Sequence, residues 1–224
     1  MKIIQKKINH PIPYNEAMKW FNCVNSKKKK KNCEQIYVFE HEDVYTYGKS
    51  IQKDSQVPET INGTKTVQAD RGGLWTWHGK GQVMIYFVLN LRRRKISLHD
   101  WFAIVEPVFV KLIQNEIGDN RYYVYADKDK RGFWVKDTQS NSIAKIGFIG
   151  LKITNGFLTH GISINYNNNL EPFKYINPCG LGDIKITSIK ELKKDDSENS
   201  QKIETEKELF KEKIGQALSK AFDN

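Results

Sequence analysis

Hydrophobic residues in this chain fall mainly in short runs and in two-residue alternation, the patterns that β-strands produce. The longest run, Val83 to Leu91, is rich in β-branched and aromatic residues and predicts a central strand. Ile36 to Phe39 predicts a second buried strand. Ile3 to Ile8 alternates weakly before Pro11, so we expect an edge strand there.

Two further pairs of strands are expected in the second half of the chain. Tyr122 to Tyr125 and Phe133 to Val135 flank a charged loop. Ile143 to Ile153 and Phe157 to Tyr166 are joined at Asn155-Gly156, a residue pair that favours tight hairpin turns. We therefore expect the second pair to form an antiparallel hairpin.

The clearest helix signal begins at Ser97. Ser97 and Asp100 form a capping box in which Asp replaces the usual Glu or Gln. Apolar residues then recur at helical spacing as far as Ile117. Pro107 lies inside this pattern, and we expect it to kink the helix or split it in two, because proline removes a backbone donor.

Two other segments have helical spacing. One runs from Asn15, the expected N-cap, to Val24. The other begins at a capping box formed by Thr205 and Glu208 and continues to Ala221. Strands interleaved with few helices predict an α+β fold: one domain with a mixed β-sheet and helices packed against it. A chain of 224 residues, 39% hydrophobic, suits such a domain.

The net charge of +10 first suggests a nucleic-acid partner. The basic runs are Lys27 to Lys31 and Arg92 to Lys95, and each is more typical of a solvated loop. We therefore expect no nucleic-acid binding; an acidic protein partner would use the same charge. The start of the chain lacks the apolar core of a secretory signal, and no apolar run is long enough to span a bilayer. We expect a cytoplasmic protein with no membrane contact.

Cys179 is the strongest candidate nucleophile. A lone cysteine is usually a small buried hydrophobe, and Cys23 fits that alternative. Cys33 lies beside lysines and has no second signal. Cys179 differs because Pro178 and Gly180 place it on a bent loop, where its side chain can be presented to a cleft. An odd number of cysteines argues against a disulfide framework.

Lys145 lies among apolar neighbours on an expected strand. If its side chain faces inward, the ammonium is costly unless it is paired, and Lys145 becomes a candidate proton shuttle or thiolate partner. Because strand residues alternate faces, the side chain can also point to water, and taken in isolation Lys145 favours that interpretation. The sequence leaves both alternatives open.

The stretch from Arg71 to Gln82 is rich in glycine, which lets a ligand approach the backbone closely. Thr76, His78 and Gln82 add polar groups beyond what a turn requires. His78, His160 and Cys179 can be drawn as a zinc site, but their spacing matches no standard ligand pattern, so we expect no metal. The sequence has no phosphate-binding loop and no dinucleotide fingerprint.

Four motifs, in the family's order, together resemble the lipoyl(octanoyl) transferase family. Arg71 to Gln82 resembles its RGG-x-x-T-Y-H-G-P-G-Q motif, and Lys145-Ile146 resembles its catalytic-lysine motif. Thr159 to Asn165 resembles F-H-G-x-A-x-N. Pro172-Phe173 and Asn177 to Gly180 resemble the segment that carries the nucleophile. The resemblance covers most of the chain, although Trp77, Lys80 and Tyr125 depart from the pattern.

The resemblance implies the fold of lipoate and biotin ligases, with residues 1–190 as the catalytic domain and residues 191–224 as a charged linker and a helix packed on it. It implies transfer of an octanoyl group from an acyl carrier protein to a lysine of a lipoyl domain. Cys179 would carry the acyl group as a thioester and Lys145 would be its proton partner, with no cofactor. The positions implied to contact the substrate are Arg71, Gly72, Gly73, Leu74, Trp75, Thr76, Trp77, His78, Phe148, Ile149, Gly150, Gly161, Ile162 and Ser163.

The partners implied are octanoyl-acyl carrier protein as donor, and the lipoyl domains of 2-oxoacid dehydrogenase complexes and the glycine cleavage H protein as acceptors. We expect a monomer. One alternative is an ATP-dependent lipoate or biotin ligase, which needs no cysteine nucleophile. The other is a non-catalytic module that binds nucleic acid or acidic protein, against which the presence of both Lys145 and Cys179 argues.

Overall fold

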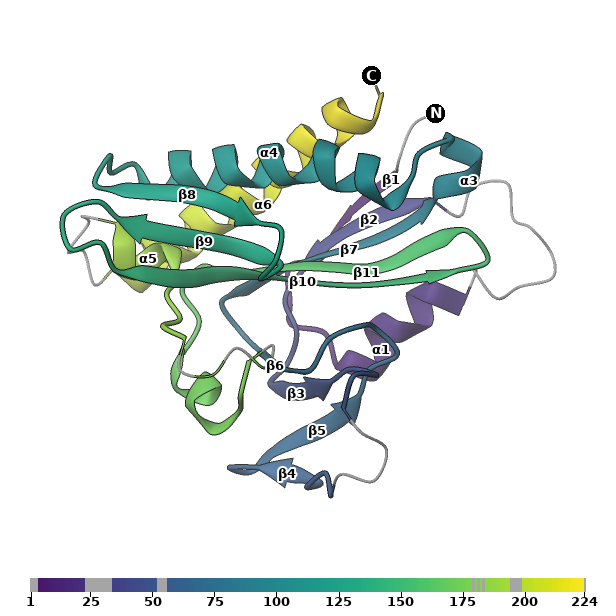
Figure 1. Ribbon diagram of the computed structural model, residues 1–224, viewed down its shortest axis with the longest axis horizontal. Coiled ribbons are helices and arrows are strands. Elements are labelled where there is room, and N and C mark those ends of the chain that lie inside the picture. The colour runs from purple at the N-terminus through teal and green to yellow at the C-terminus, as the bar shows by residue number, and fades with distance from the viewer. Residues whose placement is uncertain are drawn as a thin grey trace.

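The computed structural model describes residues 4–22, 34–51, 56–178, 180, 182, 184–193 and 199–223. A seven-stranded mixed sheet forms the middle of the molecule, with two long helices on one face and a smaller four-stranded sheet beyond the other face (Figure 1). This arrangement is the predicted α+β fold. None of the helices in the described ranges is long and apolar enough to cross a membrane.

The seven-stranded sheet has the order β1-β2-β7-β11-β10-β9-β8. Only the β1–β2 pair is parallel; the other neighbours are antiparallel. Its strands are β1 (Ile4–Lys7), β2 (Gln35–Phe39), β7 (Gln82–Asn90), β8 (Tyr122–Asp127), β9 (Gly132–Asp137), β10 (Ile143–Thr154) and β11 (Phe157–Asn165). The predictions of an edge strand at the N-terminus, a central strand near Val83 and a hairpin turning at Asn155-Gly156 are confirmed.

Helices α4 (Leu98–Ile117) and α6 (Ser200–Asp223) cover one face of this sheet (Figure 1). The predicted capping box of α4 is present, because the Ser97 hydroxyl accepts from the Asp100 N–H and the Asp100 carboxylate accepts from the Ser97 N–H. Pro107 was expected to kink or split this helix; the split is wrong, since α4 is one continuous helix. Proline removes one backbone donor, and burial of apolar residues on both sides of it, from Trp101 to Ile113, outweighs that loss.

The starts of the other two helices also differ from expectation. α1 (Tyr14–Met18) is capped by Pro13 rather than Asn15 and continues as a short 3₁₀ helix, Lys19–Phe21; Val24 lies outside the described residues. α6 begins five residues before Thr205, whose hydroxyl donates to the Gln201 carbonyl inside the helix. The Asn199 side chain accepts from the first backbone N–H groups instead, as an N-cap residue does.

The smaller sheet has the order β4-β5-β3-β6. Its strands are β3 (Val44–Tyr47), β4 (Thr60–Ile61), β5 (Thr64–Gln68) and β6 (Trp75–His78). Three short helices complete the description: α3 (Leu91–Arg94), η2 (Glu171–Tyr175) and α5 (Ile189–Leu192). The glycine-rich segment connects β5 to β6 and therefore lies where the two sheets approach one another.

Candidate active site

A cavity lies between the glycine-rich segment and the sheet face that carries no long helix. Its lining residues are Arg71, Gly72, Gly73, Leu74, Trp75, Thr76, His78, Met84, Tyr86, Phe148, Ile149, Gly150, His160, Gly161, Ile162 and Ser163. Every position implied to contact the substrate is among them except Trp77. Segments that are far apart in the sequence are thus brought to one cavity.

The floor of the cavity is formed by three adjacent strands. The register of β10, β11 and β7 aligns Phe148, Ser163 and Met84 in one row, and Gly150, Gly161 and Tyr86 in the next. A Cβ at Gly161 would overlap the carbonyl oxygen of Ile85, so this position needs glycine. The missing side chains at Gly150 and Gly161 leave room above the floor.

The roof is the segment that follows Asp70. Arg71 donates to the carbonyl oxygens of Gly72, Leu74 and Thr46, so its guanidinium organises the roof as well as lining the cavity. The Gly72 N–H donates to the Leu151 carbonyl of β10 at 3.0 Å. These bonds hold the roof at a fixed height above the floor.

Trp77 lies on the other side of β6. Strand alternation turns it away from Thr76 and His78. It packs in a separate cluster with Tyr45, and its ring meets Phe173 edge-on at 5.8 Å. Its place in the fold is therefore that of a packing aromatic.

His78 begins a chain of side-chain hydrogen bonds. Its Nδ1 lies 2.7 Å from Gln82 Oε1, Gln82 Nε2 donates to Asn165 Oδ1, and Asn165 Nδ2 donates to the Thr187 carbonyl. Because a carbonyl only accepts, the chain of bonds places the hydrogen on His78 Nδ1 and leaves Nε2 unprotonated. Burial lowers the pKa of His78 well below its usual value, so the ring is neutral. Thr187 N–H donates in turn to the Lys145 carbonyl at 3.0 Å.

Three lining residues, Met84, Tyr86 and His160, were not among the predicted contacts. Met84 and Tyr86 are two positions apart in β7, so their side chains share a face of the strand. This two-residue period was the sequence signal that could have predicted both as lining residues. His160 precedes Gly161, and its Nε2 lies 2.6 Å from Asp70 Oδ1. Burial lowers the pKa of His160 although Asp70 opposes that shift, whereas the hydrogen bond to His160 lowers the pKa of Asp70.

His41, expected only as a strand-end polar residue, supports the floor. Its Nδ1 lies 2.9 Å from the Ile12 carbonyl oxygen, which accepts a hydrogen bond from the Nδ1–H, and its Nε2 lies 3.0 Å from the Tyr86 hydroxyl. Burial lowers the pKa of His41 to about 4. A neutral His41 thus holds the Tyr86 hydroxyl in place.

The last helix reaches the turn between β6 and β7 through buried charges. Glu40 Oε2 accepts from the Gly81 N–H at 2.6 Å, and Glu40 is paired with Lys207 at 3.0 Å and Lys211 at 2.5 Å. All three charged side chains are buried. Burial opposes ionisation of Glu40, but the bonds from Lys211 and Gly81 outweigh it and lower its pKa. α6 therefore helps to fix the segment that connects His78 to Gln82.

Among the described residues, one group of side chains has metal-ligand spacing: Glu40, Glu204 and Glu208. Lys207 and Lys211 already pair with these carboxylates. Two buried ammonium groups supply the positive charge that a cation would bring, so the group is an ion-pair network.

Lys145 faces inward. Its side chain is fully buried, and its Nζ donates to the carbonyl oxygen of Arg131 at 2.8 Å. The same ammonium lies 4.8 Å from the centre of the Trp134 ring and 5.3 Å from that of Phe148, as cation–π contacts do. Phe148 lines the cavity, so Lys145 lies beside it.

Cys179 lies outside the described residues, as do Cys23 and Cys33. Its described neighbours, Pro178 and Gly180, lie against two lining residues of the cavity. Pro178 pairs with Trp75 in a parallel β-bridge. Leu74 packs against Gly180, because a Cβ added to Gly180 would lie only 2.5 Å from Leu74 Cδ1. The chain on both sides of position 179 therefore meets lining residues of the roof.

Known proteins resemble this chain over most of its length. The lipoyl protein ligase A/B catalytic domain matches residues 13–216. An octanoyltransferase of Neisseria meningitidis serogroup B is 33% identical over 189 residues, which are 84% of this chain and 84% of that protein. An octanoyltransferase of Buchnera aphidicola subsp. Acyrthosiphon pisum is 33% identical over 159 residues, 71% of this chain and 70% of that protein. The chain belongs to the octanoyltransferase family. The prediction of an acyltransferase is thereby confirmed.

Solved structures share the fold of this octanoyltransferase-family chain. A bipartite lipoate protein ligase from Thermoplasma acidophilum superposes with a TM-score of 0.61 at 9% identity, covering 99% of this chain and 84% of that one. A lipoate-protein ligase A bound with ATP gives 0.60 at 10% identity, covering 100% and 95%. At such low identity these likenesses show the fold alone. The ligase alternative is therefore weaker than membership of the octanoyltransferase family.

Proposed function

We propose that this protein moves an octanoyl group from the thioester of an acyl carrier protein to the ε-amine of a lysine on a lipoyl domain, through a thioester on Cys179. The observation that supports this most is the position of Lys145, buried beside Phe148 of a cavity whose lining residues Trp75 and Leu74 are in turn contacted by the residues flanking Cys179. A buried lysine next to a cysteine-bearing loop is a setting for thiolate chemistry.

Two acyl transfers follow from this proposal. In the first, the Cys179 thiolate attacks the carrier thioester; a new C–S bond forms and the carrier C–S bond breaks. The carrier thiolate leaves and takes a proton from the Lys145 ammonium, which leaves Lys145 as a neutral amine for the second step. In the second, the acceptor amine attacks the Cys179 thioester; a C–N bond forms and the C–S bond breaks. The amine gives up a proton to Lys145, and the Cys179 thiolate is restored. Neither step needs a nucleotide, because the thioester already holds the energy of amide formation.

Lys145 has a different role in each step. As an ammonium it stabilises the Cys179 thiolate and lowers the pKa of the thiol. As a neutral amine it accepts the proton of the attacking lysine. Backbone N–H groups of the glycine-rich roof are available to stabilise the tetrahedral oxyanion.

The cavity suits an unbranched apolar chain. Leu74, Met84, Phe148 and Ile162 supply apolar walls, and Gly161 leaves the floor open. The buried histidines are neutral, so the cavity presents no imidazolium charge to an alkyl chain. An octanoyl group is unbranched and apolar and therefore matches this lining.

The protein partners follow from the reaction: octanoyl-acyl carrier protein as donor and lipoyl domains of 2-oxoacid dehydrogenase complexes and the glycine cleavage H protein as acceptors. Arg92, Arg93 and Lys95 are exposed on and beside α3 and form a candidate surface for an acidic carrier. The other predicted surface, Lys27 to Lys31, lies outside the described residues. We propose a cytoplasmic monomer without a cofactor.

A nucleotide-free transfer assay tests the proposal. Purified protein, octanoyl-loaded carrier and an unmodified lipoyl domain are mixed without ATP, and the lipoyl domain is followed by mass spectrometry. We expect octanoylation, and none from free octanoate in a parallel reaction without ATP. A strict need for ATP with the carrier substrate would favour the lipoate ligase alternative instead.

A further inference from the structure

Two rows of side chains cross the outer three strands of the large sheet. Tyr125, Trp134 and Lys145 are register partners across β8, β9 and β10. The next row outward is Tyr123, Lys136 and Ile143. Both rows lie on one face, because positions two apart in a strand share a face. The rows are about 7 Å apart at the usual rise per residue.

This face is the one that carries no long helix. Val124 and Val135 occupy the row between the two and point to the opposite side, where they join the core beneath α4. The row that contains Tyr123 is therefore separated from the helices by the sheet itself. It continues the surface beside Lys145 out toward the edge strand β8.

The outer row exposes large apolar groups to solvent. Tyr123 is 59% exposed and Ile143 is 47% exposed, and Tyr123 stacks on Tyr125 with 6.0 Å between ring centres. Single exposed hydrophobic residues are ordinary on a surface, but here two lie in one row with an aromatic stack beside them. We call Tyr123, Tyr125, Lys136 and Ile143 the tyrosine platform.

The charges around the platform favour an acidic partner. Lys136 lies between Tyr123 and Ile143 in the register, and Lys185 is exposed on the segment that bonds the Lys145 N–H. Asp137 at the platform's edge is neutralised by its ion pair with Arg121. The platform thus combines aromatic anchors with net positive charge, a composition typical of protein interfaces.

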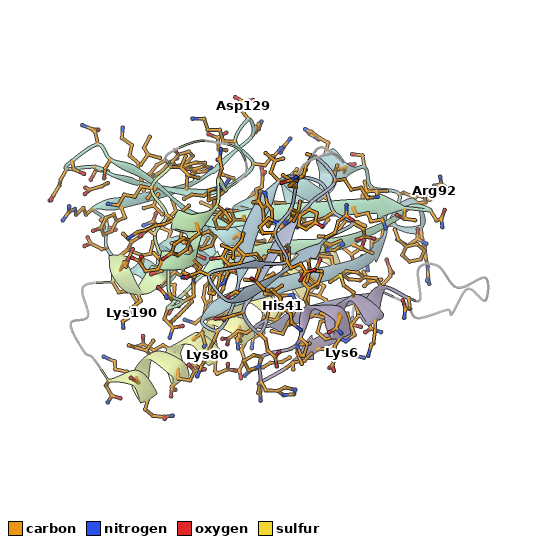
Figure 2. All side chains as sticks on the ribbon, turned by 90° about the horizontal axis from the view of Figure 1, so that it is seen from below. Lys6, His41, Lys80, Arg92, Asp129 and Lys190 are labelled. Carbon is orange, nitrogen blue, oxygen red and sulfur yellow. The ribbon has the colours of Figure 1, made fainter. Side chains whose placement is uncertain are left out.

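The two protein substrates differ in how far they can reach. A carrier presents its thioester on a long flexible arm, so its body can dock at a distance. An acceptor lysine has only a four-carbon stem, so the domain that carries it must lie directly against the surface near Lys145. Figure 2 shows that Asp129, in the β8–β9 turn, and Arg92, on α3, lie at separate places on the rim of the molecule. The platform lies at the other end of β8 and β9 from this turn. β8 and α3 lie toward opposite ends of the molecule (Figure 1), so a donor surface on α3 and an acceptor surface on the platform would not overlap.

We propose that the tyrosine platform is the docking surface for the acidic domain that carries the acceptor lysine. The inference rests on the proposed function for the identity of that domain. Tyr123 and Ile143 supply the apolar anchors, and Lys136 pairs with an acidic side chain of the partner. The partner's lysine then extends along the row of Tyr125 and Trp134 toward Lys145.

Binding and the two half-reactions test the platform separately. Binding of the unmodified lipoyl domain is measured by titration calorimetry for wild type, Tyr123→Ser, Ile143→Ser and Lys136→Glu. Ile153→Ser is the matched control, since Ile153 is 48% exposed at the other end of the same strand. We expect each platform variant to weaken binding at least tenfold and the control to bind as wild type does.

Kinetics then separate docking from chemistry. From preloaded acyl-enzyme, platform variants should raise KM for the lipoyl domain with kcat nearly unchanged. Acylation by the carrier and transfer to hydroxylamine, a small amine that needs no docking, should stay at the wild-type rate. Unchanged binding in the variants, an equal loss in Ile153→Ser, or a loss of carrier acylation instead would overturn the proposal. Absence of any acyl-enzyme in wild type would refute the proposed function, while the binding measurement would still decide the platform.

Discussion

The ammonium of Lys145 lies 4.8 Å from the centre of the Trp134 indole ring, and it donates to the carbonyl oxygen of Arg131 at 2.8 Å. A Cβ on Gly132 would come within 2.7 Å of Lys145 Cε, so the stem of the lysine is enclosed by the β8–β9 turn. The position of the ammonium is therefore set by packing on an aromatic face and by backbone carbonyls. A side chain that takes part in a reaction has to be held in one position by its surroundings, and these contacts do so for Lys145.

Substitutions of Lys145 should separate its two roles. Lys145→Ala removes both charge and base, so we expect slow acylation of Cys179 and slow onward transfer. Lys145→Arg keeps the charge but does not release a proton at working pH. We expect it to retain part of the acylation burst and to stall as acyl-enzyme, with transfer slowed roughly 10²–10⁴-fold. Single-turnover mass spectrometry measures both rates.

The space around Lys145 makes a size control necessary, because arginine is bulkier than lysine. Lys145→Met has a similar length without a charge and should lose both steps, as Lys145→Ala does. Transfer at the wild-type rate by Lys145→Arg would contradict a role for Lys145 as a base.

Replacing Glu40 with a neutral residue should destabilise the fold, because Glu40 is buried and paired with Lys207 and Lys211. Glu40→Gln leaves two buried ammonium groups with less negative charge, a change that typically costs about 3–5 kcal/mol. Glu42→Gln, on an exposed side chain two residues later, is the control and should cost little. Urea unfolding monitored by tryptophan fluorescence measures both.

The ionised Glu40 carboxylate should also make the unfolding free energy depend on pH. The folded-state pKa of Glu40 is lowered from 4.5, so its stabilising contribution is complete above that value. The contribution is lost as the pH falls through the lower folded-state pKa. The unfolding free energy of wild type should therefore decline more steeply below about pH 4.5 than that of Glu40→Gln. Parallel curves for the two proteins would show that Glu40 is not ionised in the fold.

Two glycines of the cavity should respond differently to alanine. In Gly161→Ala the new methyl group would overlap the Ile85 carbonyl, so β7 and β11 must move apart; we expect a loss of about 1–3 kcal/mol and of most activity. In Gly72→Ala the methyl group meets only the Leu151 carbonyl oxygen, at 3.7 Å, and the effect should be small. Thermal unfolding and the transfer assay together check this, and equal effects at both positions would contradict the described floor.

Local patterns in the sequence predicted those parts of the fold that local forces determine. The β10–β11 hairpin follows from Asn155-Gly156, and the start of α4 follows from Ser97 and Asp100, because each signal acts over a few residues. Thr205 failed as a cap because a run of polar residues before it can also be helical. Pro107 failed as a break because tertiary packing outweighed one missing hydrogen bond.

The site was only partly predictable for a similar reason. The family resemblance as a whole placed most of the lining residues. Strand alternation alone left the direction of Lys145 undecided until its neighbours were positioned. Glu40 and Lys207 are separated by 167 positions, and no local pattern connects them. His41 and Tyr86 are likewise joined only by the fold. Contacts of this kind depend on the complete sheet.

The central claim is that Cys179 carries the acyl group, and intact-protein mass spectrometry after incubation with octanoyl-loaded carrier protein tests it most directly. We predict a single octanoyl adduct on the wild-type chain, present also in Cys23→Ala and Cys33→Ala and absent in Cys179→Ala. An adduct that persists in Cys179→Ala, or one that disappears with either of the other two cysteines, would contradict the account.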